Sequence, residues 1–390
     1  MINRFLIKGL KIYSEEKVIK HGAVLIEGDK IAEIFTDKEH QRFCEKITYQ
    51  FSANSHLIPG FIDMHIHGCA GFDIMDATKD AISTICKTLP KEGTTSFLAT
   101  TMSLAKDNIE KSIININDFK KSNYVGAEVL GIHLEGPFIS PKKAGAHSIA
   151  NIQKPNIELL QKWNDMSEES IRLVTLAPEE DKADELVKFL HKNKIIAAIG
   201  HSNASFEEAI SAINNHCTYA THLFNAMSPI SHRSPGCAIA CLLHSDVYCE
   251  LIADNIHIHP AMVHLAQRLK GYDRIILVTD AMRAKCLKDG TYDLGGKDVI
   301  VKNDKAALPD GTLAGSVLKM VDGFKNVQNN LQCTVEQLIK ITSTNPARIL
   351  NLLDRKGTIS KGKDADLVIL DENYEVIFTT CRGKIVYQKD

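Results

Sequence analysis

Histidine and carboxylate side chains recur in this chain directly after short apolar runs. The 390 residues include 16 histidines. Five runs end in segments that contain such residues: Asp63-Met64-His65-Ile66-His67, His133-Leu134-Glu135, Gly200-His201-Ser202, Thr221-His222-Leu223 and Thr279-Asp280-Ala281. Residues i and i+2 of a strand share a face, so His65 and His67 would point the same way. Imidazole and carboxylate together bind Zn²⁺, Fe²⁺ and similar cations, and the pattern predicts a catalytic metal site.

Eight apolar runs must bring these side chains together. The runs are short, rich in Ile, Val and Leu, and mostly not alternating, which is typical of strands buried on both faces of a parallel sheet. They span Leu57–Gly68, Gly93–Thr100, Ala127–Pro137, Ile171–Pro178, Lys194–Ser202, Tyr219–Asn225, Cys249–His257 and Arg274–Met282. Stretches with helical spacing, such as Phe206–Asn214 and Pro260–Lys270, lie between runs. Eight strand–helix units predict a (β/α)8 barrel of the TIM type, with the polar residues at the catalytic ends of its strands.

The two ends of the chain have a different pattern. Gly22–Ile34 and Ala365–Tyr387 alternate apolar and polar residues around turn signals, which indicates antiparallel strands with one solvated face. Each end is too short to make a stable sheet alone. We therefore expect an α/β protein in which residues 1–56 and 354–390 form a small β-sandwich domain beside a catalytic barrel of residues 57–353.

Composition limits the classes of protein. The chain has 46 basic and 48 acidic residues and a net charge of −2, which gives no basic excess for nucleic acid or an anionic membrane. With 44% hydrophobic and 24% charged residues, the composition is that of a globular protein. No signal-like or membrane-length apolar run is present, and the ten cysteines form no CxxC pair. We expect a soluble cytoplasmic protein with free, mostly buried thiols.

Ten segments carry a resemblance to a known family. They are PGFIDMHIHG (59–68), HLEGPF (133–138), GAH (145–147), GHSNAS (200–205), THLFNAM (221–227), ADNIHIHP (253–260), VTDAM (278–282), DGTLAGS (310–316), NPA (345–347) and GTISKGKDADLVIL (357–370). In this order the chain resembles the amidohydrolase superfamily and, within it, the N-acetylglucosamine-6-phosphate deacetylases. Related dihydroorotase- and hydantoinase-like enzymes bridge two metals with a modified lysine on strand four, but here that strand ends in Thr175-Leu176-Ala177-Pro178 without one.

The resemblance implies a set of metal ligands. Glu135, His201 and His222 match the main ligands, and three protein ligands with one open position are the catalytic arrangement for zinc. His65 and His67 match the ligands of a second site, with Glu135 able to bridge the two. The expected cofactor is one or two divalent ions per subunit, Zn²⁺ or Fe²⁺.

The resemblance also implies catalytic and substrate-binding residues. Asp280 matches the aspartate that takes a proton from the attacking water and passes it to the departing amine, and His147 matches the histidine that contacts the amide carbonyl. The expected substrate-binding residues are Ala146, His147, Asn225, Ala226, Arg233, His257, Leu313, Ala314 and Gly315. We expect His133 to lie behind the ligands, and Lys285 and Lys288 to be solvated loop residues.

These residues imply a function. The expected reaction is metal-dependent hydrolysis of N-acetylglucosamine 6-phosphate to glucosamine 6-phosphate and acetate, in amino-sugar catabolism. The expected assembly is a homodimer whose phosphate anchors come from the neighbouring subunit. Two alternatives stay open: another amidohydrolase acting on an N-acyl sugar or cyclic amide, and a catalytically dead homologue that only binds.

Overall fold

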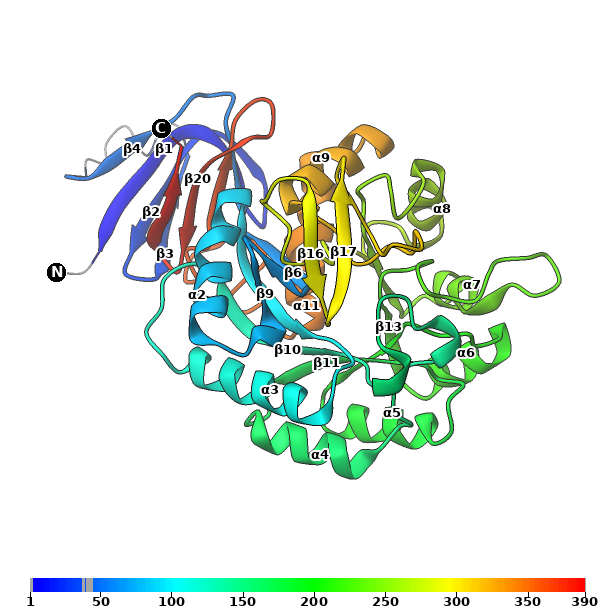
Figure 1. The fold of residues 1–390 in the computed structure, drawn as a ribbon. Helices are drawn as coiled ribbons and strands as arrows, with labels where there is room; N and C mark the ends of the chain where they lie inside the picture. The colour runs from blue at the N-terminus through cyan, green and yellow to red at the C-terminus, as the bar shows by residue number, and fades with distance from the viewer. Residues whose placement is uncertain (1–2, 37–38, 40–44, 390) are drawn as a thin grey trace.

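Eight parallel strands form the central sheet of the computed structural model, which describes residues 3–36, 39 and 45–389 (Figure 1). In order around the sheet they are β6 (Phe61–Ile66), β9 (Thr94–Thr101), β10 (Glu128–Glu135), β11 (Ile171–Leu176), β12 (Ile196–Ile199), β13 (Cys217–Ala220), β14 (Tyr248–Leu251) and β15 (Ile275–Leu277). A parallel bridge between Ile66 and Ala281 joins the first strand to the segment that follows the last strand. The predicted barrel is confirmed.

Helices follow the strands and cover the outside of the barrel (Figure 1). They are α2 (Lys79–Thr88), α3 (Lys106–Lys120), α4 (Ile157–Met166), α5 (Ala183–Lys192), α6 (Phe206–Asn214), α7 (Gly236–Leu243), α8 (Pro260–Lys270) and α9 (Met320–Leu331), with α10 (Val335–Ile339) and α11 (Asn345–Ile349) after them. Local chemistry starts two of them: Ser205 and Glu208 form a capping box on α6, and His259 accepts from the backbone of α8 beside Pro260. The predicted bounds of α6 and α8 are confirmed.

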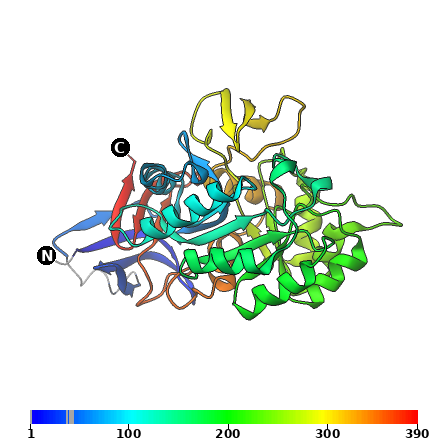
Figure 2. The same cartoon turned by 60° about the horizontal axis from the view of Figure 1, so that its bottom comes forward.

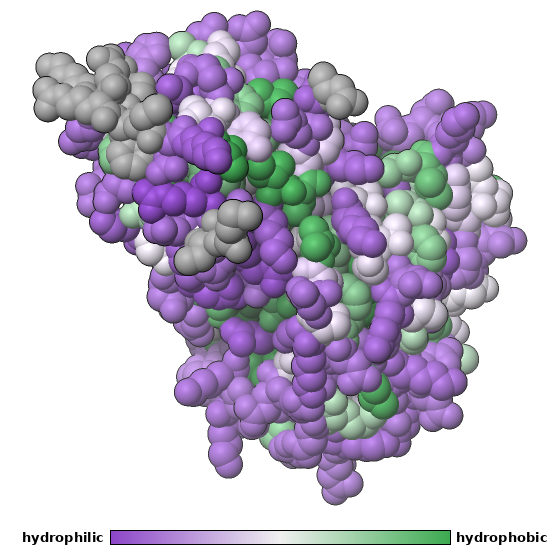
Figure 3. Space-filling view, turned by 90° about the vertical axis from the view of Figure 1, so that its left-hand side faces the viewer, coloured by the Kyte–Doolittle hydropathy of each residue, from purple (hydrophilic) through white to green (hydrophobic). Residues whose placement is uncertain are grey.

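Strands from both ends of the chain form one antiparallel-rich sheet at the side of the barrel. They are β1 (Arg4–Tyr13), β2 (Val18–Glu27), β3 (Lys30–Phe35), β4 (Thr48–Gln50), β5 (His56–Pro59), β19 (Leu367–Leu370), β20 (Val376–Cys381) and β21 (Lys384–Gln388). Phe5, Val24 and Phe378 share one buried cluster, so both ends enclose the same core. Seen from this side, the surface is mainly hydrophilic with a strip of hydrophobic residues (Figure 3). The domain boundaries at 56/57 and 353/354 stay a prediction.

The first predicted run is two strands rather than one. Residues 57–68 divide at Gly60, where β5 ends in the terminal sheet and β6 begins in the barrel. A Cβ atom at Gly60 would lie 2.1 Å from the Oγ1 atom of Thr95, so only glycine allows this close approach. One apolar run therefore serves two sheets, which periodicity alone does not reveal.

A small sheet that the sequence analysis did not predict stands above the barrel (Figure 2). It comprises β16 (Gly290–Leu294), β17 (Lys297–Lys302) and β18 (Lys305–Ala307). Leu294 and Val299 pack in one cluster with Met102 and Ala314, which belong to loops at the top of the barrel. The insertion therefore packs against the loops at the top of the barrel and forms part of the surface at that end.

The prediction that Lys285 is solvated is wrong, whereas Lys288 is exposed. Lys285 is fully buried, and its ammonium lies 2.5 Å from the Oε1 atom of Glu92. The reason is that the chain after β15 turns inward: the carbonyl of Lys285 accepts from the amide of Ala70 at 2.8 Å. A buried ammonium needs a counter-charge, and Glu92 supplies it.

Nine cysteines lie in the described part of the chain, all of them free, and only Cys286 is exposed. This agrees with the expectation of free thiols. No helix in the described residues has the length and apolar character needed to cross a bilayer.

A buried ion cluster joins the barrel to the terminal sheet. The Nζ atom of Lys356 lies 2.7 Å from Glu128, at the start of β10, and 3.3 Å from Asp364, just before β19, and it also contacts Asp366. Arg355 pairs with Glu128 at 2.8 Å. Burial alone would raise the pKa of Glu128, but Lys356 and Arg355 lower it to about 2. The cluster therefore depends on both cations.

We predict that Lys356→Met destabilises the protein by about 3–5 kcal/mol, because it leaves buried carboxylates without their cation. Urea unfolding followed by the fluorescence of the buried Trp163 measures the loss. The control is Lys361→Met, whose partner Glu33 is exposed, and it should cost about 0–1 kcal/mol. Equal losses in the two variants would contradict the prediction.

The same cluster predicts a dependence of stability on pH. Because the pKa of Glu128 falls from an ordinary 4.5 to about 2 in the folded state, its stabilisation is complete above about pH 5 and is lost as the pH falls toward 2. Lys356→Met should flatten this part of the profile of unfolding free energy against pH. An unchanged slope would show that the pair does not set it.

Candidate active site

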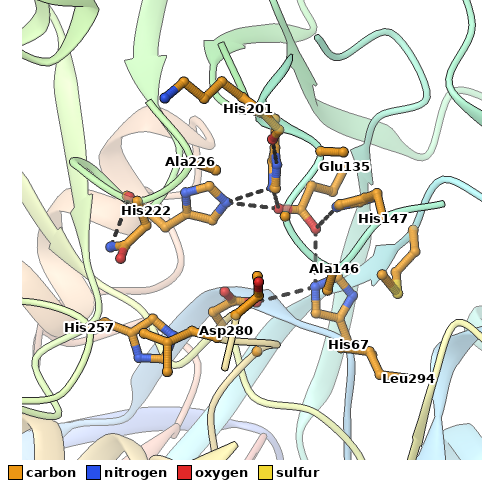
Figure 4. A pocket seen from close by; sticks show the side chains of 18 of the residues that line it. His67, Glu135, Ala146, His147, His201, His222, Ala226, His257, Asp280 and Leu294 are labelled. Carbon is orange, nitrogen blue, oxygen red and sulfur yellow. Dashed lines mark hydrogen bonds and ion pairs between the residues drawn. The ribbon is translucent and has the colours of Figure 1, made fainter. Parts of the chain in front are cut away.

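A pocket of about 380 Å³ opens at the C-terminal ends of the barrel strands (Figure 4). Its lining residues come from several loops and from the insertion: His67, Met102, Glu135, Lys142, Lys143, Ala144, Gly145, Ala146, His147, His201, His222, Asn225, Ala226, His257, Asp280, Leu294, Thr312, Leu313 and Gly315. Barrel enzymes carry their active sites at this end. The pocket is therefore the candidate active site.

The carboxylate of Glu135, at the end of β10, is the centre of the polar cluster. Its Oε1 atom lies 3.1 Å from the Nε2 atom of His201 and 3.0 Å from that of His222. Its Oε2 atom lies 3.2 Å from the Nε2 atom of His67 and 3.3 Å from that of His147. The structure thus brings the three predicted main ligands together.

The predicted second-site ligands face the same centre from the end of β6. His65, His67 and Asp280 offer ligand atoms that all lie within 4.8 Å of one another. The Oδ1 atom of Asp280 is 3.2 Å from the Nε2 atom of His67 and 3.4 Å from that of His65. Because Glu135 Oε1 is 3.5 Å from His65 Nε2, this carboxylate lies between the two groups, as a bridging ligand would.

The hydrogen bonds of the imidazoles fit a cation at this centre. The Nδ1 atom of His201 donates to the carbonyl of Lys143 at 2.8 Å, which leaves the Nε2 lone pair facing Glu135. His65 Nδ1 donates to Glu250 at 3.0 Å, and its buried Nε2 has no hydrogen-bond partner among the described residues. Lone pairs that converge on a carboxylate call for a positive charge between them, and divalent metals take imidazole and carboxylate ligands.

The pKa values show the same demand for positive charge. Burial lowers the pKa of His67, but Asp280 and Glu135 outweigh it and raise the pKa to about 10. Burial raises the pKa of Asp280, but His65 and His67 outweigh it and hold the pKa below the ordinary range. Asp280 is therefore ionised at neutral pH and can accept a proton.

His147 is held as a neutral hydrogen-bond donor. Burial lowers its pKa to about 4, so the ring is uncharged at neutral pH. The amide of Ser103 donates to its Nδ1 atom at 3.1 Å, which puts the proton of the neutral ring on Nε2, the atom that faces the pocket. Lys297, in the insertion, donates to the backbone carbonyl of His147 at 3.0 Å. An N–H at this place can donate to a carbonyl oxygen bound in the pocket.

Three of the clustered residues have left-handed backbone conformations. The φ angles are 46° at His201, 30° at His222 and 48° at Asp280. Such conformations cost about 1–3 kcal/mol each outside glycine and collect at functional sites. Backbone bonds hold Asp280 in place: its amide donates to the carbonyl of His65 at 2.8 Å, and its carbonyl accepts from Ser316 at 2.7 Å. The turn that carries Asp280 is thus tied to a neighbouring strand end.

The predicted substrate-binding residues divide into those inside the pocket and those outside it. Figure 4 shows Ala226 and His257 on one side of the cluster, and His147, Ala146 and Leu294 on the other. The remaining lining residues from the predicted set are Asn225, Leu313 and Gly315. The side chain of Ala314 is buried in one cluster with Met102 and Leu294, which line the pocket, and does not line it itself. Arg233 is exposed and does not line the pocket of its own chain.

Sequence reasoning missed several residues of the site. Lys142 and Lys143 line the pocket and precede the GAH segment by one residue, Ala144. A pair of cationic side chains beside a predicted substrate-binding loop is a signal that could have identified them. Met102 follows the end of β9, and no histidine or carboxylate at that strand end marks it as part of a site. Leu294 belongs to the insertion, which was not predicted.

His133 lies behind the ligands, where the sequence analysis expected it. Its Nε2 atom is 2.8 Å from the hydroxyl of Thr175, and its ring centre is 4.5 Å from that of His65. Burial and the neighbouring His65 hold the pKa of His133 well below its ordinary value. A neutral ring in this position packs against a ligand without adding charge.

Comparisons with known proteins agree with this geometry. The model of the amidohydrolase family matches residues 56–386. An N-acetylglucosamine-6-phosphate deacetylase of Bacillus subtilis is 45% identical over 390 residues, 99% of this chain and 98% of the relative. The crystal structure of such a deacetylase from Thermotoga maritima is 35% identical, covers 98% of this chain and 100% of its own, and has a TM-score of 0.88.

A third similar protein is a point mutant of an N-acetyl-D-glucosamine-6-phosphate deacetylase from Mycobacterium smegmatis, in complex with N-acetyl-D-glucosamine 6-phosphate. It is 28% identical, covers 99% of this chain and 100% of its own, and has a TM-score of 0.92. These likenesses extend over the barrel and the terminal sheet alike. The chain belongs to the amidohydrolase family and, within it, to the N-acetylglucosamine-6-phosphate deacetylases.

Proposed function

We propose that the protein is a metal-dependent enzyme that hydrolyses N-acetylglucosamine 6-phosphate to glucosamine 6-phosphate and acetate in amino-sugar catabolism. The observation that carries this is the cluster of four pocket histidines and Asp280 around Glu135, in a chain 45% identical to a deacetylase of this name. A cytoplasmic location is part of the proposal, and the free buried thiols favour it because they persist in a reducing compartment.

Acetate release from a panel of phosphorylated N-acyl sugars tests the proposal. Activity should appear with N-acetylglucosamine 6-phosphate, disappear after chelation and return when Zn²⁺ or Fe²⁺ is added back. Hydrolysis of a cyclic amide but of no N-acyl sugar would favour another amidohydrolase activity, and no turnover of any amide would favour a binding protein.

Glu135, His201 and His222 would hold one divalent ion, and His65 and His67 with Glu135 would hold a second. Such an ion, Zn²⁺ or Fe²⁺, polarises a carbonyl and promotes the ionisation of water when bound. The Nε2 and carboxylate atoms of these residues already converge within about one hydrogen-bond length, so the ligand set requires no rearrangement of the strands.

Protein groups would supply the proton transfers. The ionised Asp280 accepts one proton of the attacking water and passes it to the nitrogen of the sugar as the C–N bond breaks, so the amine leaves neutral. The Nε2–H of His147 donates to the oxygen of the acetyl carbonyl, where negative charge develops. The acetic acid that forms keeps the second proton of the water and loses it to solvent at neutral pH.

We predict that Asp280→Asn lowers kcat by about 10²–10⁴-fold while substrate binding is kept, because an amide of the same shape cannot accept the proton. Acetate release measures kcat, and calorimetry with N-acetylglucosamine 6-phosphate measures binding. The control is Asp289→Asn, an exposed position outside the pocket. Turnover of Asp280→Asn within a few fold of the unchanged protein would reject the role.

We predict that Glu135→Ala loses bound metal and activity together, because it removes the carboxylate that faces both predicted ion positions. Elemental analysis of the purified variant measures the metal. His216→Ala, at an exposed histidine just before β13 and so at the other end of that strand from the pocket, should keep the metal content of the unchanged protein. Full metal content in Glu135→Ala would count against the ligand assignment.

The phosphate would be anchored by side chains on the Ala226 side of the pocket. His257 lines this side, and its Nδ1 donates to Asp254 at 2.6 Å, which fixes the ring. Arg233 stands on the exposed loop after β13 and is absent from the pocket of its own chain. Its exposure supports an arrangement in which two subunits form a homodimer and Arg233 enters the neighbouring pocket.

We predict that Arg233→Ala lowers kcat/KM for the phosphorylated sugar by roughly 10–150-fold, the cost of one charge-assisted bidentate contact, and changes the slow reaction of N-acetylglucosamine little. Steady-state kinetics on both sugars measure the difference. Equal losses of kcat/KM on the two sugars would contradict the role of Arg233 in binding the phosphate.

Subunit mixing tests whether the anchor is shared. Arg233→Ala and Asp280→Asn subunits, each impaired alone, should regain part of the activity when mixed, because one of the two pockets in a hybrid dimer then has both groups intact. A mixture that is no more active than its two components after confirmed subunit exchange would contradict the shared site.

A further inference from the structure

Glu250 is a buried carboxylate that the proposed chemistry does not use. It lies on β14, its side chain is fully buried, and it does not line the pocket. One oxygen, Oε2, accepts from the Nδ1 of His65 at 3.0 Å and also from the backbone amide of His222 at 2.8 Å. A single atom of Glu250 thus holds one residue from each of the two predicted ligand groups.

We propose that Glu250 is a positioning residue that aims His65 at the second ion and ties it to the first ion's ligand His222. The inference rests on the proposed function, because it requires that metal be bound. A carboxylate that accepts from Nδ1–H fixes the tautomer of a histidine, keeps its Nε2 lone pair free and strengthens it as a ligand.

The two histidines of the β6 end differ in this support. His65 has Glu250 behind it, whereas the buried Nδ1 of His67 has no hydrogen-bond partner among the described residues. The ring of His65 is also packed against His133, with centres 4.5 Å apart. Of the two predicted second-site ligands, His65 is therefore the one whose ring orientation is fixed, and Glu250 is the polar group that fixes it.

Glu250 also supports the strained turn that carries His222. The φ angle of His222 is 30°, and the residues after it include Phe224 at 79° and Ala226 at 49°. The amide of His222 donates to the carboxylate of Glu250, and the amide of Leu223 donates to the backbone carbonyl of Glu250 at 3.0 Å. Loss of the side chain removes one of these two bonds and leaves the other, so the turn should persist in a weakened form.

Replacements at Glu250 separate position from charge. Both recorded bonds end on Oε2, so Glu250→Gln can keep both with its amide oxygen while it loses the negative charge. Glu250→Ala loses both. Titration of metal-depleted protein with Zn²⁺ against a chromophoric chelator should show about 10–100-fold weaker binding at the weaker site in Glu250→Ala, and a smaller loss in Glu250→Gln.

A double-mutant cycle with His65 shows whether Glu250 acts through that ring. In a His65→Ala background, Glu250→Ala should weaken Zn²⁺ binding at the weaker site little further, because the ligand that Glu250 aims there is gone. Effects on the weaker site that multiply would mean that Glu250 does not act through His65 and would overturn the inference, as would unchanged Zn²⁺ affinity in folded Glu250→Gln and Glu250→Ala.

Glu92→Gln is the matched control for lost stability alone. Glu92 is a buried carboxylate paired with Lys285, and its recorded ion pair involves none of the predicted ligands. Its variant should unfold at lower urea but bind Zn²⁺ as the unchanged protein does, and an equal loss of Zn²⁺ affinity in Glu92→Gln and Glu250→Ala would overturn the inference. Absence of Zn²⁺ binding in the unchanged protein would instead refute the proposed function and this inference with it.

Discussion

The structure depends on a negative charge that is almost wholly removed from water. The carboxylate of Glu135 belongs to a residue only 2% exposed, and imidazole nitrogens of four histidines lie within 3.3 Å of it. A buried carboxylate without compensation would be protonated or would destabilise the fold. The Nδ1 atom of His201 donates to the carbonyl of Lys143, so this imidazole offers only a lone pair to the carboxylate, and the arrangement is complete when a cation joins them. The same requirement explains why hydrogen bonds at Nδ1 fix the rings of His65 and His201.

The backbone bonds that close the barrel also hold the residues of the site together. The bridge between Ile66 and Ala281 joins the first strand to the segment after the last, and the amide of Asp280 donates to the carbonyl of His65 at 2.8 Å. These bonds set the spacing between Asp280 and the β6 histidines, because their backbones belong to the closing segments. Residues from distant parts of the sequence are thereby held in contact by main-chain hydrogen bonds, whose geometry tolerates little variation. A barrel that failed to close would also fail to form the predicted metal site.

The sequence predicted what depends on local pattern and missed what depends on distant partners. Strand-end residues such as His65 and Glu135 could be predicted from the sequence, because buried parallel strands are apolar and polar residues at their ends are easily recognised. Glu250 could not be predicted as a site residue, because it lies within an apolar run and its role depends on contact with His65, which is far away in sequence. The sequence predicted Lys285 to be a solvated loop residue, because it does not show that Glu92 lies beside Lys285 in the fold. The insertion of β16–β18 has short strands with one exposed face, a pattern too weak to stand out between a barrel strand and a helix.

The site divides its work between rigid and variable parts of the fold. His65, His67 and Glu135 lie on β6, β10 or the residue that follows, so these predicted metal ligands are carried by the barrel itself. The groups at the two sides of the pocket, such as His147 and Ala226, stand on connecting segments, which tolerate changes in length and sequence better than strands do. Precise metal geometry needs a rigid frame, whereas recognition of one sugar rather than another needs only a few repositioned contacts. On this division, changes of substrate within the fold belong to the loops and the insertion, and changes of chemistry require altered strand ends.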